Sequence, residues 1–254
     1  MEDKYKNLRL YNGVMGGFHF VQGLLILFLS NDYTLPITTN YLQFNEATQS
    51  LQPVTKTIAE VPVGAMIAAF LFLSAIAHFT LTIKPVYDWY IKNLKREINY
   101  ARWIEYSISS SLMIVIIAML VGVYDLSTLI LMFSLNAMMI FFGMVMEVHN
   151  QTTEKTNWLS YFFGCIAGIV PWVVIALFLA GSGSEGAKAP TFVYWIFFSI
   201  FIFFNIFAVN MFLQYKKIGK WKDYVFGEKV YILLSLVAKS LLAWQVFAGT
   251  LRPV

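Results

Sequence analysis

One lysine lies in the middle of an otherwise uncharged apolar stretch. The stretch is YILLSLVAKSLLAWQVFAG, residues 231–249, and the lysine is Lys239. An ammonium group at the centre of a bilayer costs roughly 2.5–3.5 kcal/mol on insertion scales, so we take Lys239 as the first candidate functional residue. A structural ion pair is the alternative. Snorkelling to the membrane surface is disfavoured, because about ten helical residues follow the lysine at 1.5 Å each.

A second set of polar residues occurs in the segment RWIEYSIS. The set has the spacing i, i+3, i+4 and i+7, which places its members on one face of a helix. They are Arg102, Glu105, Tyr106 and Ser109. Such a face is too polar for lipid, so we expect it to line the interior of a helix bundle, where Lys239 must also point. Glu105 is then the natural counter-charge of the lysine.

The depth of these groups in the membrane leaves the pairing open. Residue counts from the helix ends separate Glu105 and Lys239 by roughly 12 Å along the axis, before side-chain reach and helix tilt are considered. A pair between Arg102 and Glu105 near the membrane surface is the alternative, and we favour contact between Glu105 and Lys239. Glu147 lies near the end of its own apolar run, and we interpret it as a solvated charge at the membrane rim.

The elements that must position these residues are long apolar helices. Hydrophobic residues make up 59% of the chain and charged residues 13%, a composition typical of integral membrane proteins. A spanning helix needs about 20 apolar residues. The sequence contains seven such runs, at 9–30, 58–83, 99–123, 127–149, 157–180, 191–215 and 225–249. We predict an all-α membrane protein, a seven-transmembrane helix bundle that forms one domain over residues 1–254.

The lysines and arginines predict how the bundle is oriented. Fourteen of the 18 fall at the N-terminus and around the second, fourth and sixth connections: Lys4, Lys6, Arg9, Lys84, Lys92, Lys95, Arg96, Arg102, Lys155, Lys216, Lys217, Lys220, Lys222 and Lys229. Lys56, Lys188 and Arg252 fall on the opposite side. Short cytoplasmic loops collect basic residues, so we expect a multi-pass protein of the cell membrane with a cytoplasmic N-terminus and an extracellular C-terminus. The basic charge then needs no nucleic-acid partner.

The first connection, residues 31–57, is long for a helical membrane protein. Its segment TLPITTNYLQFN has β-branched and aromatic residues on either side of Thr39 and Asn40, which favours a short external β-hairpin; a disordered linker is the alternative. A hairpin leaves a strand edge unpaired, and a second copy of the chain can cover such an edge. We therefore expect a homodimer. The first apolar run has full spanning length, so no cleavable signal peptide is expected.

Two histidines lie inside the first and second apolar runs. His19 is near the middle of its run, and His78 follows Ser74 by one helical turn. Imidazole titrates near neutral pH, so both are candidates for accepting a proton or organising water, and a hydrogen-bonded structural role is the alternative. We recognise no metal-binding cluster, phosphate loop or nucleophile triad, so neither a metal site nor an enzyme is expected.

The whole pattern resembles a known superfamily. Seven helices with a lysine in the middle of the seventh and Arg-x-x-Glu on the third resemble the microbial (type 1) rhodopsins. Within them, the cytoplasmic N-terminus, the long first loop and the segments RWIEYSISSS and SLVAKSLLAW resemble the heliorhodopsins over essentially the whole chain. The resemblance implies that retinal, expected to be all-trans, is bound as a Schiff base to Lys239 with Glu105 as its counterion.

The chain departs from the pumping members of that superfamily at two positions. Ser235 stands where pumps resembling bacteriorhodopsin have an aspartate, and Ile116 stands where they have a carboxylate proton donor. Residues 112–122 contain no ionisable group. We therefore expect light to move a proton inside the cytoplasmic half, through groups such as His19, His78 and Ser235, without net transport.

The expected function is thus a light sensor that signals to a cytoplasmic partner or a neighbouring subunit. A light-driven or light-gated ion transporter is the alternative, and a membrane enzyme or scaffold that binds no retinal and uses Lys239 only structurally is the third. Candidates for the retinal pocket are Asn136, Met139, Trp172 and Asn205, although aromatic residues make up 17% of the chain and simple bundle packing also explains such positions.

Overall fold

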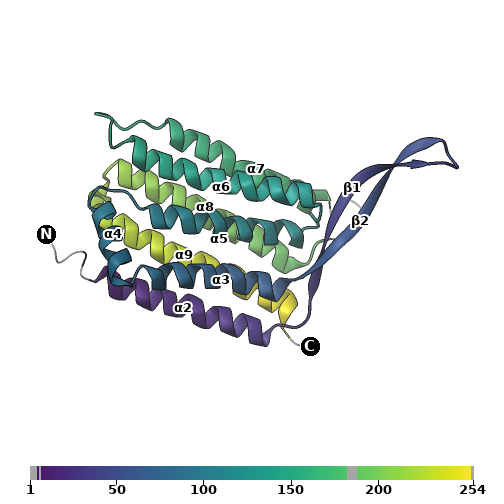
Figure 1. Cartoon of the computed structure of the whole chain (residues 1–254), viewed down its shortest axis with the longest axis horizontal. Coiled ribbons are helices and arrows are strands. Elements are labelled where there is room, and N and C mark those ends of the chain that lie inside the picture. Colours follow the sequence, from purple (N-terminus) through teal and green to yellow (C-terminus); the bar gives the residue numbers. More distant parts are fainter. Residues whose placement is uncertain (1–4, 6, 182–187, 253–254) are drawn as a thin grey trace.

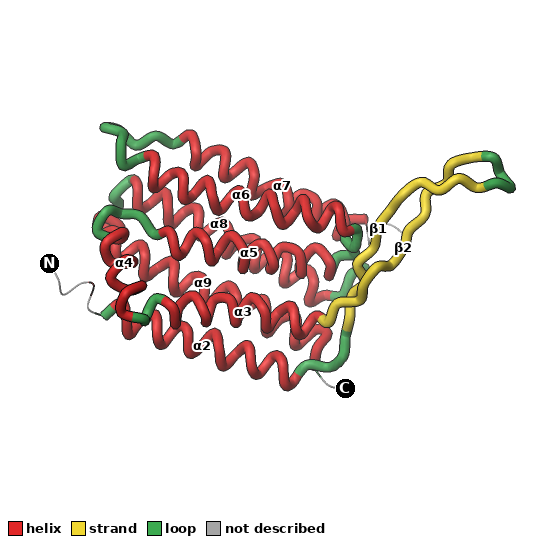
Figure 2. The backbone as a smooth tube through the Cα atoms, viewed as in Figure 1, coloured by secondary structure: helices red, strands yellow, loops and turns green. Residues whose placement is uncertain are grey.

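Seven helices of the described residues, which are 5, 7–181 and 188–252 of this computed structural model, are long and apolar enough to cross a membrane. They are α2 (Leu8–Leu29), α3 (Val63–Thr80), α5 (Tyr100–Leu120), α6 (Leu126–His149), α7 (Leu159–Gly181), α8 (Thr191–Tyr215) and α9 (Tyr224–Val246), which a π-helical turn continues over Phe247–Leu251. They run side by side in one bundle (Figures 1 and 2). The predicted seven-helix bundle is confirmed.

The first connection forms a β-hairpin that is longer than expected. Strand β1 (Thr34–Asn45) pairs with the antiparallel strand β2 (Ser50–Pro62), and the hairpin projects beyond the bundle (Figure 1). The second spanning helix therefore begins at residue 63, and the predicted start at 58 is wrong because residues 58–62 extend β2. Proline lacks an amide hydrogen and fixes φ, which suits Pro62 to this strand-to-helix junction. The predicted all-α fold therefore holds for the membrane-spanning part, whereas the first connection is a β-hairpin.

The hairpin reverses at its far end and not at Thr39 and Asn40, so that part of the prediction is wrong. The Asn45 side chain accepts hydrogen bonds from the backbone N–H groups of Ala47 (2.9 Å) and Thr48 (3.3 Å), and Gln49 has a positive φ of 52°. This Asx turn reverses the chain over residues 46–49. Thr39 and Asn40 instead lie within β1, just after a β-bulge between Ile37 and Thr38.

A short helix that the sequence analysis missed crosses one end of the bundle. Helix α4 (Lys84–Leu94) has Pro85 in its first turn and buries Tyr90, Asn93 and Leu94 (Figure 1). Its buried side chains join a small apolar cluster with Leu8 at the start of α2. The two ends of the bundle are therefore distinct, and we call them the α4 end and the hairpin end.

Polar caps fix the starts of the helices that carry the candidate residues. The Asn99 side chain accepts from Arg102 N at 3.0 Å and begins α5, and the Asp223 side chain accepts from Val225 N at 3.1 Å and begins α9. At the hairpin end, Asp125 accepts from the backbone N–H of Thr128 at 2.9 Å and begins α6. This hydrogen bond lowers the pKa of Asp125 below its usual range.

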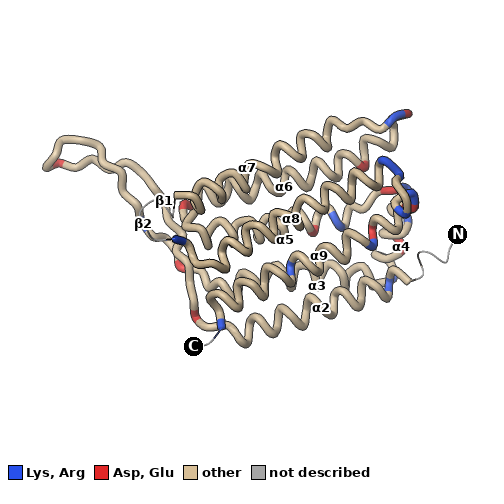
Figure 3. The backbone as a smooth tube through the Cα atoms, turned by 180° about the vertical axis from the view of Figure 1, so that it is seen from behind, with Lys and Arg blue, Asp and Glu red and all other residues tan. Residues whose placement is uncertain are grey.

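The two halves of the bundle differ in polarity. In the hairpin half, α5 buries an almost unbroken apolar set in the main core, Met113, Ile114, Ile116, Ile117 and Met119. Lysines and arginines gather at the α4 end (Figure 3). Lys4 and Lys6, which entered the orientation argument, lie outside the described residues. The expected dry half of the third spanning helix is therefore present.

Candidate functional site

Lys239 is buried inside the bundle beside one carboxylate and two hydroxyl groups. Its Nζ lies 2.8 Å from Glu105 Oε1, 3.0 Å from Ser235 Oγ and 2.5 Å from Ser74 Oγ. Only 3% of the lysine is exposed. Because a buried ammonium needs both a counter-charge and hydrogen-bond acceptors, this arrangement satisfies the charge and all three of its donors.

Three helices meet at this point. Glu105 comes from α5, Ser74 from α3, and Ser235 precedes Lys239 by one turn of α9. Ser74 Oγ also donates to Glu105 Oε1 at 2.6 Å, so the serine holds the carboxylate on the side that faces the lysine. The lengths of the two charged side chains bridge the axial offset that the sequence left open. The alternative pair between Arg102 and Glu105 does not form, because Arg102 is bound elsewhere.

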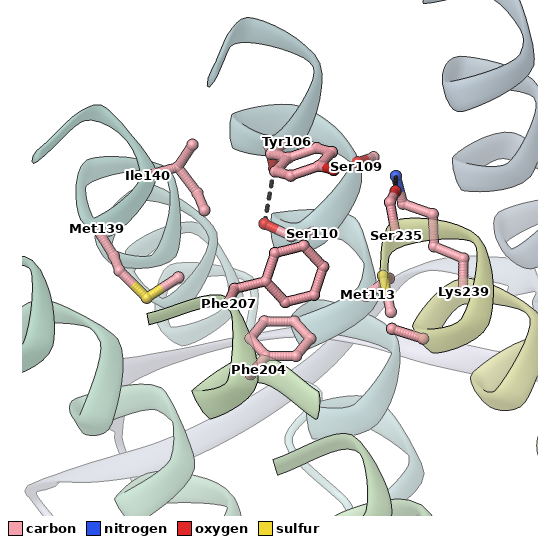
Figure 4. Close-up of a pocket in the computed structure, with 11 residues that line it drawn as sticks. Tyr106, Ser109, Ser110, Met113, Met139, Ile140, Phe204, Phe207, Ser235 and Lys239 are labelled. Atoms are coloured by element: carbon pink, nitrogen blue, oxygen red, sulfur yellow. Dashed lines mark hydrogen bonds between the residues drawn. The ribbon is translucent and has the colours of Figure 1, made fainter. Parts of the chain in front are cut away.

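An apolar cavity begins at Lys239 and extends across the bundle. The space between its lining atoms amounts to about 400 Å³, which includes space that is open to the surroundings. Its lining consists of Tyr106, Ser109, Ser110, Met113, Met139, Ile140, Phe204, Phe207, Ser235, Ala238 and Lys239. Figure 4 shows Lys239 and Ser235 entering from α9 on one side, Phe204 and Phe207 between, and Met139 and Ile140 on the far side. The lysine is thus at one end of an elongated apolar space.

A second cavity of about 560 Å³ continues this space between α5, α6, α7 and α8. The two cavities share Tyr106, Met139, Ile140, Phe204 and Phe207. Glycine at position 143 keeps the second cavity open, because a Cβ there would lie 2.5 Å from the Trp103 ring. At position 168 a Cβ would collide with Met139 Sδ. Gly143 and Gly168 therefore leave room for the side chains of Trp103 and Met139, which line these cavities.

The other side of the Lys239 site contains the two histidines. His78 Nδ1 is hydrogen-bonded to Asn12 Oδ1 at 2.7 Å, and its ring stacks on that of His19 with centroids 5.6 Å apart. His19 is fully buried, and neither of its ring nitrogens has a hydrogen-bond partner among the described residues. A small cavity beside His78 and Glu105 continues toward Arg102 and the α4 end.

Arg102 lies at the centre of a second buried group, which we call the Arg102 cluster: Arg102, Glu147 and Glu228. Arg102 Nη1 donates to Glu228 Oε1, and Nη2 donates to Glu147 Oε1 at 2.5 Å. The interpretation of Glu147 as a solvated rim charge is wrong, since only 1% of it is exposed. Its helix ends nearby, but Asn99 N and Trp103 Nε1 donate to Glu147 Oε2 at 2.9 and 2.6 Å and fix it inside.

Sequence comparison agrees with this geometry. The family model described as Heliorhodopsin matches residues 8–251, from the first residue of α2 to the last residue of the π-helical turn after α9. The chain belongs to the heliorhodopsin family. A comparison with curated proteins finds no match. The resemblance drawn from RWIEYSISSS and SLVAKSLLAW is therefore confirmed.

Membership in the heliorhodopsins makes the chain a multi-pass membrane protein and a retinal-binding rhodopsin of the photoreceptor type, a group that does not generally act as enzymes. The residues of this chain fit retinal. They offer a primary amine beside an apolar cavity lined by Met113, Met139, Phe204 and Phe207, which suits a polyene with one polar end. Glu105 is the one carboxylate beside that amine among the residues that the structure describes.

The other predicted pocket residues are only partly in the cavity. Met139, Tyr106, Ser109 and Ser235 line it. Asn136 supports it from behind by donating to Ser110 Oγ at 2.9 Å and Ser111 Oγ at 3.1 Å. Trp172 does not line it, because its ring packs edge-on against Phe204, which does. The expectation for Asn205 is wrong, since this residue is exposed and donates to Phe201 O of its own helix.

Glu228 is the functional candidate that the sequence analysis missed. It is fully buried near the start of α9 and precedes Lys239 by 11 residues. Three turns of α-helix occupy about 11 residues, so both side chains lie on one helix face. That spacing is the signal in the sequence that points to Glu228, but the nearby lysine-rich sixth connection makes a solvated charge the simpler interpretation of this position.

We predict that Arg102→Met will destabilise the protein by about 3–5 kcal/mol, because it leaves the buried carboxyl groups of Glu147 and Glu228 without the cation that binds both. The measurement is the thermal unfolding midpoint in detergent, followed by circular dichroism. Arg96→Met is the matched control, since Arg96 is exposed at the α4 end and should change the midpoint little. Equal midpoints for the two variants would contradict a central role for Arg102 in the packing of α5, α6 and α9.

Proposed function

We propose that Lys239 carries retinal as a Schiff base, that Glu105 is the counterion, and that light drives a conformational signal without net ion transport. The contact between Lys239 Nζ and Glu105 Oε1 at 2.8 Å carries this proposal. Retinal, expected to be all-trans, supplies absorption of visible light and a light-driven change of shape. The surrounding residues stabilise the charge at the lysine nitrogen and accept the proton that it loses.

Glu105 keeps a cation stable at the lysine nitrogen. A buried positive charge is costly unless an anion accompanies it, and Glu105 is the one carboxylate that contacts the nitrogen within the described structure. Ser74 donates to Glu105 and holds its orientation, while Ser235 offers an oxygen to the nitrogen from the preceding turn. A change in the position of the nitrogen relative to Glu105 alters the electrostatics of α3, α5 and α9 together.

The polar side of the site offers places for a displaced proton. His19 and His78 stack beside Ser74 and Glu105, and Asn12 fixes one nitrogen of His78. On the hairpin side, the buried residues of α5 are apolar, and they provide no proton acceptor. We infer that a proton leaving the lysine nitrogen moves toward the α4 end and returns from it, which gives no net transport.

We further propose that the α4 end faces the cytoplasm. Basic residues gather there (Figure 3), as they do in short cytoplasmic loops. The polar path from Lys239 past His78 to the Arg102 cluster points to the same end. A cytoplasmic signalling partner, or a neighbouring subunit, would then read the change at this surface.

The hairpin supports a homodimer. Its outer part exposes apolar side chains, Tyr41, Leu42, Phe44 and Leu51, with 46–63% of each accessible. A two-stranded sheet also leaves strand edges unpaired. A second copy of this chain offers a matching edge and a matching apolar surface, which is why we favour it as the occupant.

Colour tests the proposed attachment. Protein produced with all-trans retinal should absorb visible light, and Lys239→Ala should lose this absorption band completely because the amine is gone. Lys56→Ala on the exposed hairpin is the matched control and should keep the band. A colourless wild type, or a coloured Lys239→Ala protein that still binds retinal covalently, would end the assignment.

Transport measurements test the absence of pumping. Vesicles that contain the protein should show at most a transient pH change under continuous light. A sustained pH change that an uncoupler abolishes would instead identify a light-driven ion transporter.

Sedimentation in detergent tests the dimer. The wild type should sediment as a dimer, and the double variant Leu42→Glu with Leu51→Glu should shift toward the monomer through charge repulsion across the apolar surface. Wild-type protein found only as a monomer would rule out the hairpin interface.

A further inference from the structure

The buried charges of the chain do not balance. Within the described residues, the buried cations are Arg102 and Lys239, and the buried anions are Glu147 and Glu228, with Glu105 nearly buried at 10% side-chain exposure. Glu105 neutralises Lys239. Arg102 is then left with two carboxylates, and an excess negative charge inside a membrane bundle is strongly unfavourable.

Hydrogen bonds indicate which carboxylate is ionised. Glu147 accepts four donors: Arg102 Nη2 and Tyr224 Oη at Oε1, and Asn99 N and Trp103 Nε1 at Oε2. An ionised carboxylate has about four acceptor positions, so Glu147 has no position left for a proton. The ionised form of Glu147 is therefore the one that this environment satisfies.

Glu228 has a different environment. Its carboxyl group accepts from Arg102 Nη1 and from Asn99 Nδ2, the latter at 2.6 Å, and these are its two donors among the described residues. Acceptor positions remain on the group, so a bound proton displaces no donor. Tyr90 interacts electrostatically with Glu228 from α4, and its hydroxyl is buried beside the side chain of Asn12.

We propose that Glu228 carries a proton in the dark state, so that the Arg102 cluster consists of one guanidinium, one carboxylate and one carboxylic acid and is electrically neutral. The cluster is then a second proton-binding site, separate from the lysine nitrogen. The titratable groups that face it are Tyr90 on α4, Tyr106 on α5, Tyr215 on α8, and Tyr224 and Tyr231 on α9.

This proton can exchange with the solution at the α4 end. A polar pocket of about 620 Å³ opens there, and its lining includes Glu97, Lys217, Tyr215 and Tyr224. Tyr224 is shared between pocket and cluster, since its hydroxyl donates to Glu147 Oε1 at 3.0 Å. Tyr224 therefore links the pocket to the Glu147 side of the cluster.

The cluster is also connected to the light-sensitive site. The small cavity beside Glu105 and His78 is lined by Arg102, Asn99 and Tyr90 as well. The cluster thus lies between the lysine nitrogen and the α4 end and can replace or receive the proton that light displaces. This role rests on the proposed function, whereas the presence of the proton in the dark does not.

Infrared spectroscopy of the purified dark protein tests the proposal. At about pH 8, exposed glutamates with a pKa near 4.3 are ionised, so a carbonyl stretching band of a protonated carboxylic acid reports a buried group. We expect this band in wild type, a shift when glutamate is labelled with ¹³C, and a shift after transfer to D₂O. A wild type without the band overturns the proposal, and a band that D₂O leaves unchanged overturns the exchange through the pocket.

Three variants assign the band. Glu228→Gln and Glu147→Gln should each lose it, because one carboxylate then balances Arg102 without a proton. Glu46→Gln on the exposed hairpin turn is the matched control and should keep it. A band that survives in Glu228→Gln contradicts the proposal. The visible absorption of the same samples reports the chromophore site separately, so either claim can fail alone, and the wild-type spectrum stands even if a variant does not fold.

Discussion

The ion pair between Lys239 and Glu105 is the interaction on which the rest of the structure depends. An ammonium in an apolar bundle requires a partner, and that partner must reach it from another helix. The pair therefore sets the relative positions of α5 and α9, and Ser74 brings in α3. Because the lysine faces inward, the same constraint that stabilises its charge also places its amine beside the apolar cavity.

A second constraint follows from the asymmetry of the bundle. Apolar packing fills the hairpin half of α5, whereas histidines, Arg102 and two buried carboxylates occupy the half toward α4. Charge displaced at Lys239 has polar partners in one direction. A membrane pump needs them in both, and a sensor needs them only on the side that signals. The Arg102 cluster gives that side a fixed point where α5, α6 and α9 meet.

Much of this arrangement follows from the sequence, and the exceptions have physical reasons. Long apolar runs give the helices directly, and the spacing of Arg102, Glu105 and Ser109 gives the inward face of α5. Burial of Glu147 could not be derived from its position near a helix end, because its donors come from residues far along the chain, such as Asn99 and Trp103. Trp172 likewise depends on which side of α7 meets α8, and no spacing rule supplies that.

The sequence predicted the partner of Lys239 correctly but did not predict the position of the hairpin turn. Strand propensity predicted a hairpin, but the turn is fixed by the Asn45 side chain and not by the polar pair in the middle of the strand. For Glu105, the high cost of an unpaired buried charge predicted the partner of Lys239, even though axial distances left the pairing open.

The absorption maximum of Glu105→Gln, reconstituted with retinal, tests the central claim most directly. An ionised Glu105 stabilises the positive charge at the Lys239 nitrogen, so its removal should move the band to longer wavelength, while Glu60→Gln on the exposed hairpin should leave the band in place. An unchanged absorption maximum in Glu105→Gln would contradict the assignment of Glu105 as the counterion.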